Sequence, residues 1–105
     1  MAARVDKDTF ESEVLHSERL TLADFYSDSC VPCKRLSPVL AEIEEKYENE
    51  IKLVKININF DLELAEKYEV QSVPAILFFR NGEVVSRLDG FVKSGEISSV
   101  IENLK

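Results

Sequence analysis

The sequence predicts an α/β fold, a mixed central sheet of four or five strands flanked by helices on both faces. Strand-like apolar runs alternate with helical patterns before residue 70, as in parallel strands joined by crossover helices. Two apolar runs then flank Asn81-Gly82, a pattern typical of an antiparallel hairpin. Because 45% of the 105 residues are hydrophobic, the chain can bury a core, and we expect a single domain spanning 1–105.

The first half of the chain predicts one strand between two helices. A first helix is expected through Phe10 and Leu15, capped by Asp8 or a neighbouring residue. The run 20–26 is apolar and typical of a buried strand. A second helix should extend to Tyr47, because apolar side chains recur at helical spacing. These are Leu36, Leu40, Ile43 and Tyr47.

The second half predicts three strands and two helices. A strand is expected at 51–58, a short helix near 62–68, and the hairpin strands at 75–80 and 84–88. The last helix should cover 94–104, where apolar residues again follow helical spacing. These are Ile97, Val100, Ile101 and Leu104.

Cys30 and Cys33 are the only cysteines, and their Cys-x-x-Cys spacing permits three interpretations: a structural disulfide, half of a metal site or a reversible dithiol. A disulfide across so short a loop stabilises the fold by roughly 2 kcal/mol before strain is subtracted. A structural zinc site needs four ligands, and the chain adds only His16 to the two cysteines. We therefore favour the reversible dithiol and expect no metal and no organic cofactor.

The flanking residues support redox chemistry at the cysteines. Pro32 suits the first turn of a helix, which places Cys30 at the helix N-terminus. Unpaired N–H groups and the positive end of the helix dipole favour a thiolate there, and a thiolate is the nucleophile of disulfide exchange. Cys33, one turn inside the helix, is expected to be shielded and to resolve a mixed disulfide on Cys30.

Composition excludes several other functions. A formal charge of −7 argues against nucleic acid or an anionic membrane as the main partner. No apolar stretch approaches the ~20 residues of a membrane span, and the N-terminus lacks the basic-then-apolar layout of a signal peptide. We expect a cytoplasmic protein, and in that reducing compartment a Cys-x-x-Cys is more often catalytic than structural.

Several further motifs stand at fixed distances from the cysteine pair. They are Ala23-Asp24-Phe25-Tyr26, Cys30-Val31-Pro32-Cys33-Lys34, Pro38, Lys55, Val73-Pro74-Ala75, Asn81-Gly82 and Gly90. In this combination the chain resembles the thioredoxin family over nearly its full length. The resemblance implies a thioredoxin fold and a monomeric protein-disulfide reductase. Its partners would be disulfide-containing proteins and the thioredoxin reductase that recharges it.

The resemblance assigns roles to residues outside the cysteine pair. Asp24 lies in an apolar strand, where desolvation disfavours the charged form, and is expected to exchange a proton with Cys33. The alternative is an ordinary carboxylate at a strand end or sheet edge. Lys55, on the adjacent strand, is expected to pair with Asp24. The Val73-Pro74 peptide bond is expected to be cis and to face the cysteines.

The same comparison implies a substrate-binding patch around Cys30. It would be apolar and offer backbone pairing to an extended substrate. Its residues would be Val31, Pro32, Val73, Pro74, Ala75 and Phe91.

Several residues depart from the usual thioredoxin pattern. Ser29 stands where Trp is usual and Val31 where Gly is usual, while Ser72 and Ala75 replace a common Gly and Thr. These departures leave two alternatives open. One is a thioredoxin-fold binding module whose cysteines turn over little, and the other is a specialised electron donor to one enzyme complex.

Overall fold

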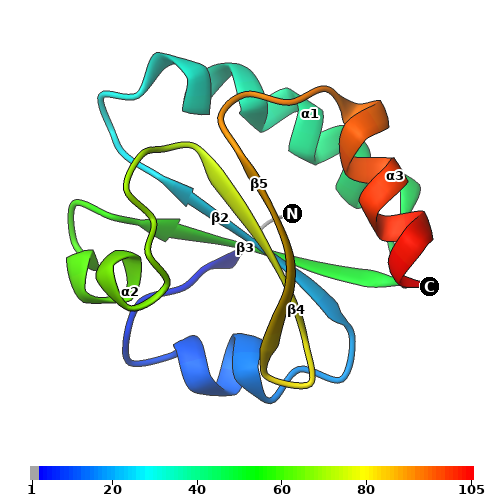
Figure 1. Ribbon diagram of the computed structural model, residues 1–105, viewed down its shortest axis with the longest axis horizontal. Helices are drawn as coiled ribbons and strands as arrows, with labels where there is room; N and C mark the ends of the chain where they lie inside the picture. The colour runs from blue at the N-terminus through cyan, green and yellow to red at the C-terminus, as the bar shows by residue number, and fades with distance from the viewer. Residues whose placement is uncertain (1–2) are drawn as a thin grey trace.

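The computed structural model describes residues 3–105, and these residues build one five-stranded sheet (Figure 1). The strands are β1 (Ala3–Arg4), β2 (Leu20–Tyr26), β3 (Ile51–Asn57), β4 (Ala75–Arg80) and β5 (Glu83–Asp89). Their spatial order is β1-β3-β2-β4-β5. The first three run parallel, while β4 is antiparallel to β2 and β5 to β4, so the predicted mixed sheet is confirmed.

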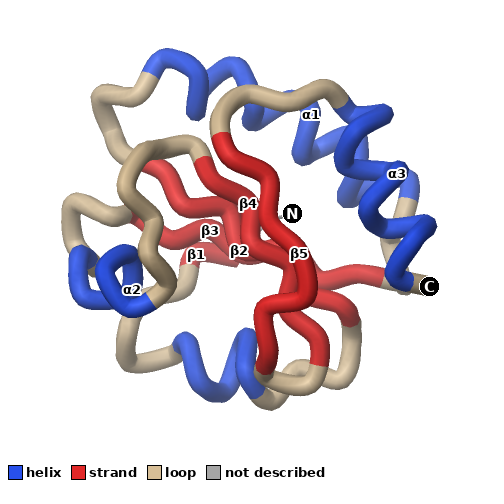
Figure 2. The backbone as a smooth tube through the Cα atoms, in the orientation of Figure 1, coloured by secondary structure: helices blue, strands red, loops and turns tan. Residues whose placement is uncertain are grey.

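Helices cover both faces of the sheet (Figure 2). They are η1 (Glu11–Leu15), α1 (Val31–Lys46), α2 (Leu62–Lys67) and α3 (Ser94–Leu104). Helices α1 and α3 pack on one face through a core that includes Leu36, Ile43 and Ile97. On the other face η1 and α2 pack through a second core that includes Val14 and Leu64. Both cores form because the strand side chains alternate between the two faces.

The hairpin and the apolar stripes lie where periodicity predicts them. Asn81 and Gly82 have φ of 52° and 81°, the left-handed pair that a tight two-residue hairpin turn requires. The predicted stripe of α1 is buried from Leu36 to Tyr47. Ile97 and Ile101 of α3 are also buried, whereas Val100 and Leu104 are only partly covered.

The N-terminal region differs from the prediction. Strand β1 was not predicted, because its two residues are too few to show a period. The first helix is a single π-helical turn rather than a regular α-helix, and the turn before it is held by Asp6 rather than Asp8. Asp6 Oδ1 accepts from the backbone N–H groups of Asp8 and Thr9 at 2.9 and 3.0 Å.

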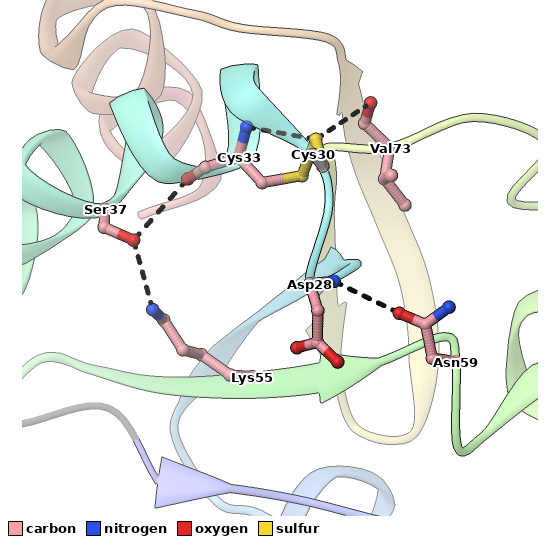
Figure 3. Close-up of a disulfide and its surroundings, with 7 residues drawn as sticks. All are labelled: Asp28, Cys30, Cys33, Ser37, Lys55, Asn59 and Val73. Atoms are coloured by element: carbon pink, nitrogen blue, oxygen red, sulfur yellow. Dashed lines mark hydrogen bonds between the residues drawn. A yellow bond between two sulfur atoms is a disulfide. The ribbon is translucent and has the colours of Figure 1, made fainter.

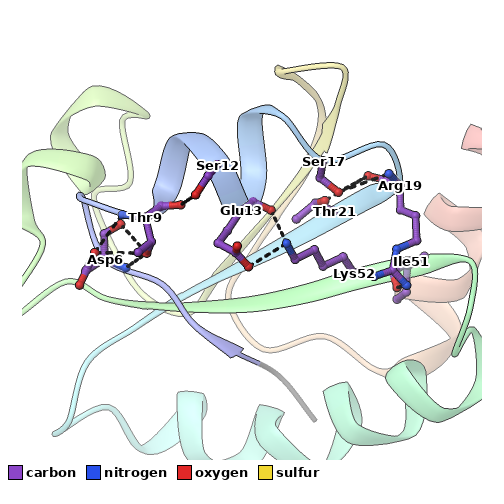
Figure 4. A network of polar contacts seen from close by, with 9 residues as sticks. All are labelled: Asp6, Thr9, Ser12, Glu13, Ser17, Arg19, Thr21, Ile51 and Lys52. Carbon is purple, nitrogen blue, oxygen red and sulfur yellow. Dashed lines mark hydrogen bonds and ion pairs between the residues drawn. The ribbon is translucent and has the colours of Figure 1, made fainter.

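A polar network fastens η1 to the sheet (Figure 4). Lys52 Nζ on β3 donates to the backbone oxygen of Glu13 at 2.8 Å and to its carboxylate at 2.9 Å. The apolar contacts of Val14 and this ion pair therefore hold the same short turn.

The topology places the cysteines at the middle of the sheet. Strand β2 pairs with β3 on one side and β4 on the other, and the residues that follow its carboxyl end lead directly into α1. The carboxyl end of a central parallel strand is where open α/β sheets bind their ligands.

Candidate active site

Cys30 and Cys33 are joined by a disulfide at the start of α1, with their Cα atoms 5.2 Å apart (Figure 3). Cys30 is the N-cap residue, and its Sγ accepts a hydrogen bond from the Cys33 backbone N–H at 3.1 Å. Pro32 lies in the first turn, where its missing N–H removes no helical bond. A negative charge on Cys30 would thus be stabilised by a backbone donor and by the helix dipole.

The two cysteines differ in exposure. Cys33 is only 5% exposed, whereas Cys30 is partly exposed at the helix end. A disulfide partner from another protein therefore meets Cys30 first. The arrangement fits a pair in which one thiol attacks and the other resolves.

The segment before β4 faces Cys30. The Val73–Pro74 peptide bond is cis, and the Val73 carbonyl oxygen lies 3.6 Å from Cys30 Sγ. Pro74 is in turn tied to the chain after β5, because its carbonyl oxygen accepts from Gly90 N–H at 2.8 Å. Two chain segments distant in sequence thus meet beside the exposed sulfur.

The apolar surface around Cys30 is smaller than the sequence predicts. Val31 is 63% exposed and Phe91 37% exposed, Pro32 is exposed, and Val73 is partly buried. Pro74 and Ala75, however, are buried. Ala75 begins β4 and its side chain belongs to the core that also includes Val14 and Leu64.

A positive charge borders this surface. The Arg35 guanidinium lies over the Phe91 ring, 4.8 Å from its centroid. This cation–π contact links Phe91 to the first turns of α1, which begin at the cysteines.

Asp24 is buried in the middle of β2, which excludes the alternative of a solvated carboxylate at a strand end or sheet edge. Its side chain is 2% exposed, and Oδ1 has no hydrogen-bond partner among the described residues. Burial raises the pKa of Asp24 from 3.8 to about 6, and the nearby charge of Lys55 opposes that rise. Asp24 also lines a pocket of about 160 Å³ that reaches Cys33. A carboxyl group that titrates near neutral pH therefore shares a pocket with the inner cysteine.

Lys55 is placed opposite Asp24 in the β2–β3 register but does not form the expected direct pair with it. Its Nζ donates instead to Ser37 Oγ at 3.3 Å and lies 5.6 Å from the centroid of the Tyr26 ring. Within residues 3–105 no ion pair links Lys55 to Asp24, so the lysine acts on the carboxylate only through its field. Sequence reasoning missed Ser37, although its position one helical turn after Cys33 was a usable signal.

A second polar group missed by sequence reasoning holds the loop before Cys30. Asp28 N–H donates to Asn59 Oδ1 at 3.1 Å, and Asn57 Nδ2 donates to Asp28 Oδ1 at 3.0 Å. A third hydrogen bond connects the two asparagines, because Asn59 N–H donates to Asn57 Oδ1 at 2.9 Å. We name Asp28, Asn57 and Asn59 the loop clamp. It anchors the segment that carries the exposed Ser29.

Two other features bear on the expectations from composition. His16 is exposed and near Glu11, and the described part of the chain holds no group of three or more metal-ligating side chains. No helix within residues 3–105 has the length and apolarity needed to cross a bilayer.

A cysteine pair at the N-terminus of a helix, facing a cis-proline and carried by the central strand of a mixed sheet, defines a thiol–disulfide oxidoreductase. The thioredoxin family model matches residues 1–103, and the chain belongs to this family. It is similar to thioredoxin 1 of Nostoc sp., with 37% identity over 101 residues that cover 96% of this chain and 94% of the relative. It is also similar to the thioredoxin of Rickettsia bellii, with 35% identity over 103 residues and 98% of each chain. The protein is a dithiol–disulfide redox carrier, as the reversible-dithiol interpretation predicted.

Proposed function

We propose that this protein reduces disulfides of other proteins, with Cys30 as the attacking thiol and Cys33 as the resolving thiol. The observation that carries the assignment is the asymmetry of the pair. Cys30 caps α1, accepts a backbone N–H bond and is the more exposed residue, whereas Cys33 is buried. The attacking role requires access and a stabilised thiolate, and only Cys30 combines them.

The reaction consists of two exchanges. The Cys30 thiolate attacks one sulfur of the substrate disulfide, whose S–S bond breaks, and the other substrate sulfur leaves as a thiolate and is protonated. Cys33 then loses its proton and attacks Cys30 Sγ, which breaks the mixed disulfide and releases the second substrate thiol. The substrate gains two electrons and two protons, and the Cys30–Cys33 disulfide forms.

Asp24 is proposed as the group that takes the proton of Cys33. Support comes from the pocket that the two residues share and from the raised pKa, which keeps Asp24 a useful base near neutral pH. Lys55 is proposed to assist through its charge, which limits how far the pKa of Asp24 rises.

Substrates are proposed to bind over the exposed apolar surface beside Cys30. Val31, Pro32 and Phe91 would contact substrate side chains, while the Val73 carbonyl offers a backbone acceptor to an extended segment. Pro74 and Ala75 would contribute by shaping the backbone underneath.

Family membership implies a reductase and disulfide-containing proteins as partners. We propose that a thioredoxin reductase recharges the protein, which works as a single-domain monomer in the reducing cytoplasm. The proposal requires no metal and no organic cofactor, because the two electrons reside in the thiols.

A trapping experiment tests the roles of the two cysteines. The Cys33→Ser variant should accumulate a mixed disulfide with substrate, and the matched Cys30→Ser variant should accumulate none. Stable capture by Cys30→Ser instead would reverse the assignment.

A coupled assay with insulin, NADPH and a thioredoxin reductase tests the class of function. Turnover supports a general reductase. A protein that stays inactive with chemically supplied electrons is a binding module, and one that reduces insulin with dithiothreitol but not through the reductase is a specialised donor.

A further inference from the structure

Ser37 connects the helix of the cysteines to the lysine beside Asp24. Lys55 Nζ on β3 donates to Ser37 Oγ at 3.3 Å, and the Ser37 hydroxyl is directed to the Cys33 carbonyl oxygen at a longer 3.5 Å (Figure 3). A hydroxyl can accept one bond and donate another at the same time. The Lys55 ammonium is therefore bonded to α1 through the Ser37 hydroxyl. Of the two bonds of that hydroxyl, the one to Lys55 is the shorter.

The ammonium has an alternative partner close by. Asp24 and Lys55 are register partners on neighbouring strands, so their side chains project on the same face of the sheet. Asp24 Oδ1 is buried and has no hydrogen-bond partner in the described chain. A buried carboxylate in this position attracts an ammonium group strongly, yet Lys55 is bonded to Ser37 and lies over the Tyr26 ring.

We propose that Ser37 is a positioning residue whose hydroxyl holds the Lys55 ammonium against α1 and so prevents a direct ion pair with Asp24. This inference rests on the proposed function, because it concerns the base assigned to Cys33. It extends that function by naming the residue that sets how basic Asp24 is.

The physical consequence follows from the two positions open to Lys55. In direct contact, the ammonium stabilises the carboxylate and lowers its pKa by about one unit or more. At the distance that Ser37 imposes, burial remains the dominant influence and the pKa stays raised. Asp24 then accepts a proton near neutral pH, where Cys33 must lose one.

Charged and titratable residue types from several elements line the pocket. They are Asp24 and Tyr26 from β2, Asp28 from the following loop, Cys33 and Lys34 from α1, and Lys55 from β3. Among the side chains of these residues, only that of Lys55 is bonded to the Ser37 hydroxyl, whose other partner is the backbone oxygen of Cys33. Removal of the hydroxyl is therefore expected to move Lys55 and to leave the other side chains in place.

The test is a carboxyl ¹³C NMR titration of Asp24 in the oxidised protein. In Ser37→Ala the midpoint should fall by about one pH unit, which is about a tenfold smaller protonated-to-ionised ratio at any pH. Ser37→Thr should titrate as wild type, because a helical threonine can direct Oγ1 toward the same carbonyl. A wild-type midpoint in Ser37→Ala, or an equal shift in both variants, would overturn the proposal.

A variant that lacks only the Lys55 ammonium separates the positioning of Lys55 from a direct effect of the Ser37 hydroxyl on Asp24. With Lys55→Met in place, Ser37→Ala should leave the Asp24 midpoint unchanged. A shift that persists without the ammonium would mean that Ser37 acts on Asp24 itself, and the positioning role would be wrong.

A kinetic readout completes the design. In Ser37→Ala, the pH profile of mixed-disulfide resolution by Cys33 should move to lower pH. The rate constant of resolution near pH 7 should fall by about threefold, because Asp24 becomes a weaker base. An unmoved profile alongside a shifted NMR midpoint would refute Asp24 as the base while leaving the role of Ser37 intact. The NMR titration needs no substrate, so the two ideas fail separately.

Discussion

The polar groups around the two ends of α1 differ in whether they have hydrogen-bond or ion-pair partners. At the C-terminal end Tyr47 is 2% exposed, and its hydroxyl donates to Glu102 at 2.8 Å. Lys105 joins Glu102 to Glu50 at 3.3 and 2.9 Å, so charges of both signs find partners. At the N-terminal end the Asp24 carboxylate has an unpartnered oxygen.

We therefore expect the groups near the C-terminal end of α1 to affect mainly stability and those near its N-terminal end to affect reactivity. Partnered groups at the C-terminal end join the end of α1, α3 and the residue before β3. The N-terminal end retains an exposed apolar surface and an incompletely satisfied acid, both of which cost stability and both of which we propose to serve exchange. Variants at the two ends should therefore change different measurements.

Removal of Tyr47 should have the largest effect on stability. Tyr47→Ala loses a buried aromatic ring and should lower the free energy of unfolding by about 3–4 kcal/mol. Tyr47→Phe keeps the ring and should lose about 1 kcal/mol with the hydrogen bond. Denaturant unfolding of the oxidised protein measures both. Disulfide reduction by Tyr47→Phe should stay within about twofold of wild type, and a larger loss would contradict the separation of the two ends.

Replacement of Asp24 should have the next largest effect, with the opposite sign. Folded Asp24 keeps its proton up to about pH 6, whereas in an unfolded chain the carboxyl ionises near pH 4. The stabilisation of the folded state by this proton is therefore fully present below about pH 4 and is lost as the pH rises through about 6. Asp24→Asn does not ionise, so it should gain up to about 3 kcal/mol relative to wild type at pH 8 and little at pH 4.

Urea unfolding of wild type and Asp24→Asn at pH 4 and pH 8 tests this gain. Asp61→Asn is a matched control, because Asp61 is also buried but already accepts from Lys7 N–H at 3.1 Å. That control should show no comparable gain at pH 8. In a reduction assay Asp24→Asn should slow resolution by about tenfold or more. An equal difference between wild type and variant at both pH values would show that Asp24 has an ordinary pKa.

The loop clamp should have an intermediate effect, because it serves both stability and reactivity. Asn57→Ala leaves Asp28 Oδ1 and Asn59 N–H without their partner and should cost about 1–2 kcal/mol. Asn59→Ala loses only the acceptor for Asp28 N–H and should cost less. Insulin reduction should slow in the same order, since the clamp anchors the loop that precedes Cys30. Normal rates in Asn57→Ala would show that the helix alone positions Cys30.

Local sequence pattern was sufficient for most of the fold. Strand β2 extends over the predicted 20–26, which is a largely apolar run, and α3 covers the predicted 94–104, where apolar residues recur at helical spacing. The turn at Asn81-Gly82 was predictable for a different reason, since both positions need φ above zero. Strand β1 was not predictable, because two residues carry no period and their pairing depends on β3.

The active site likewise has parts that local sequence pattern predicts and parts that it does not. Cys30 and Cys33 were predictable because their chemistry depends on spacing within one helical turn. The bond between Lys55 and Ser37 joins residues 18 positions apart, and that between Asp28 and Asn59 joins residues 31 apart. Such pairs depend on strand register and helix rotation, which a single sequence does not display. The burial of Ala75 was missed for the same reason.

Glu102→Gln should have the smallest effect and sharpens the contrast with Asp24 most directly. The Tyr47 hydroxyl and then Lys105 lower the pKa of Glu102 below its usual 4.5, so the ionised form is the one that the fold prefers. Its contribution is therefore present above the unfolded pKa and is lost as the pH falls through the lowered folded value. Thermal unfolding of Glu102→Gln should show a slightly lower midpoint at pH 7, a smaller drop on acidification below pH 4.5, and an unchanged reduction rate. A gain in stability at pH 7, as expected for Asp24→Asn, would mean that the two carboxylates do not differ as their surroundings require.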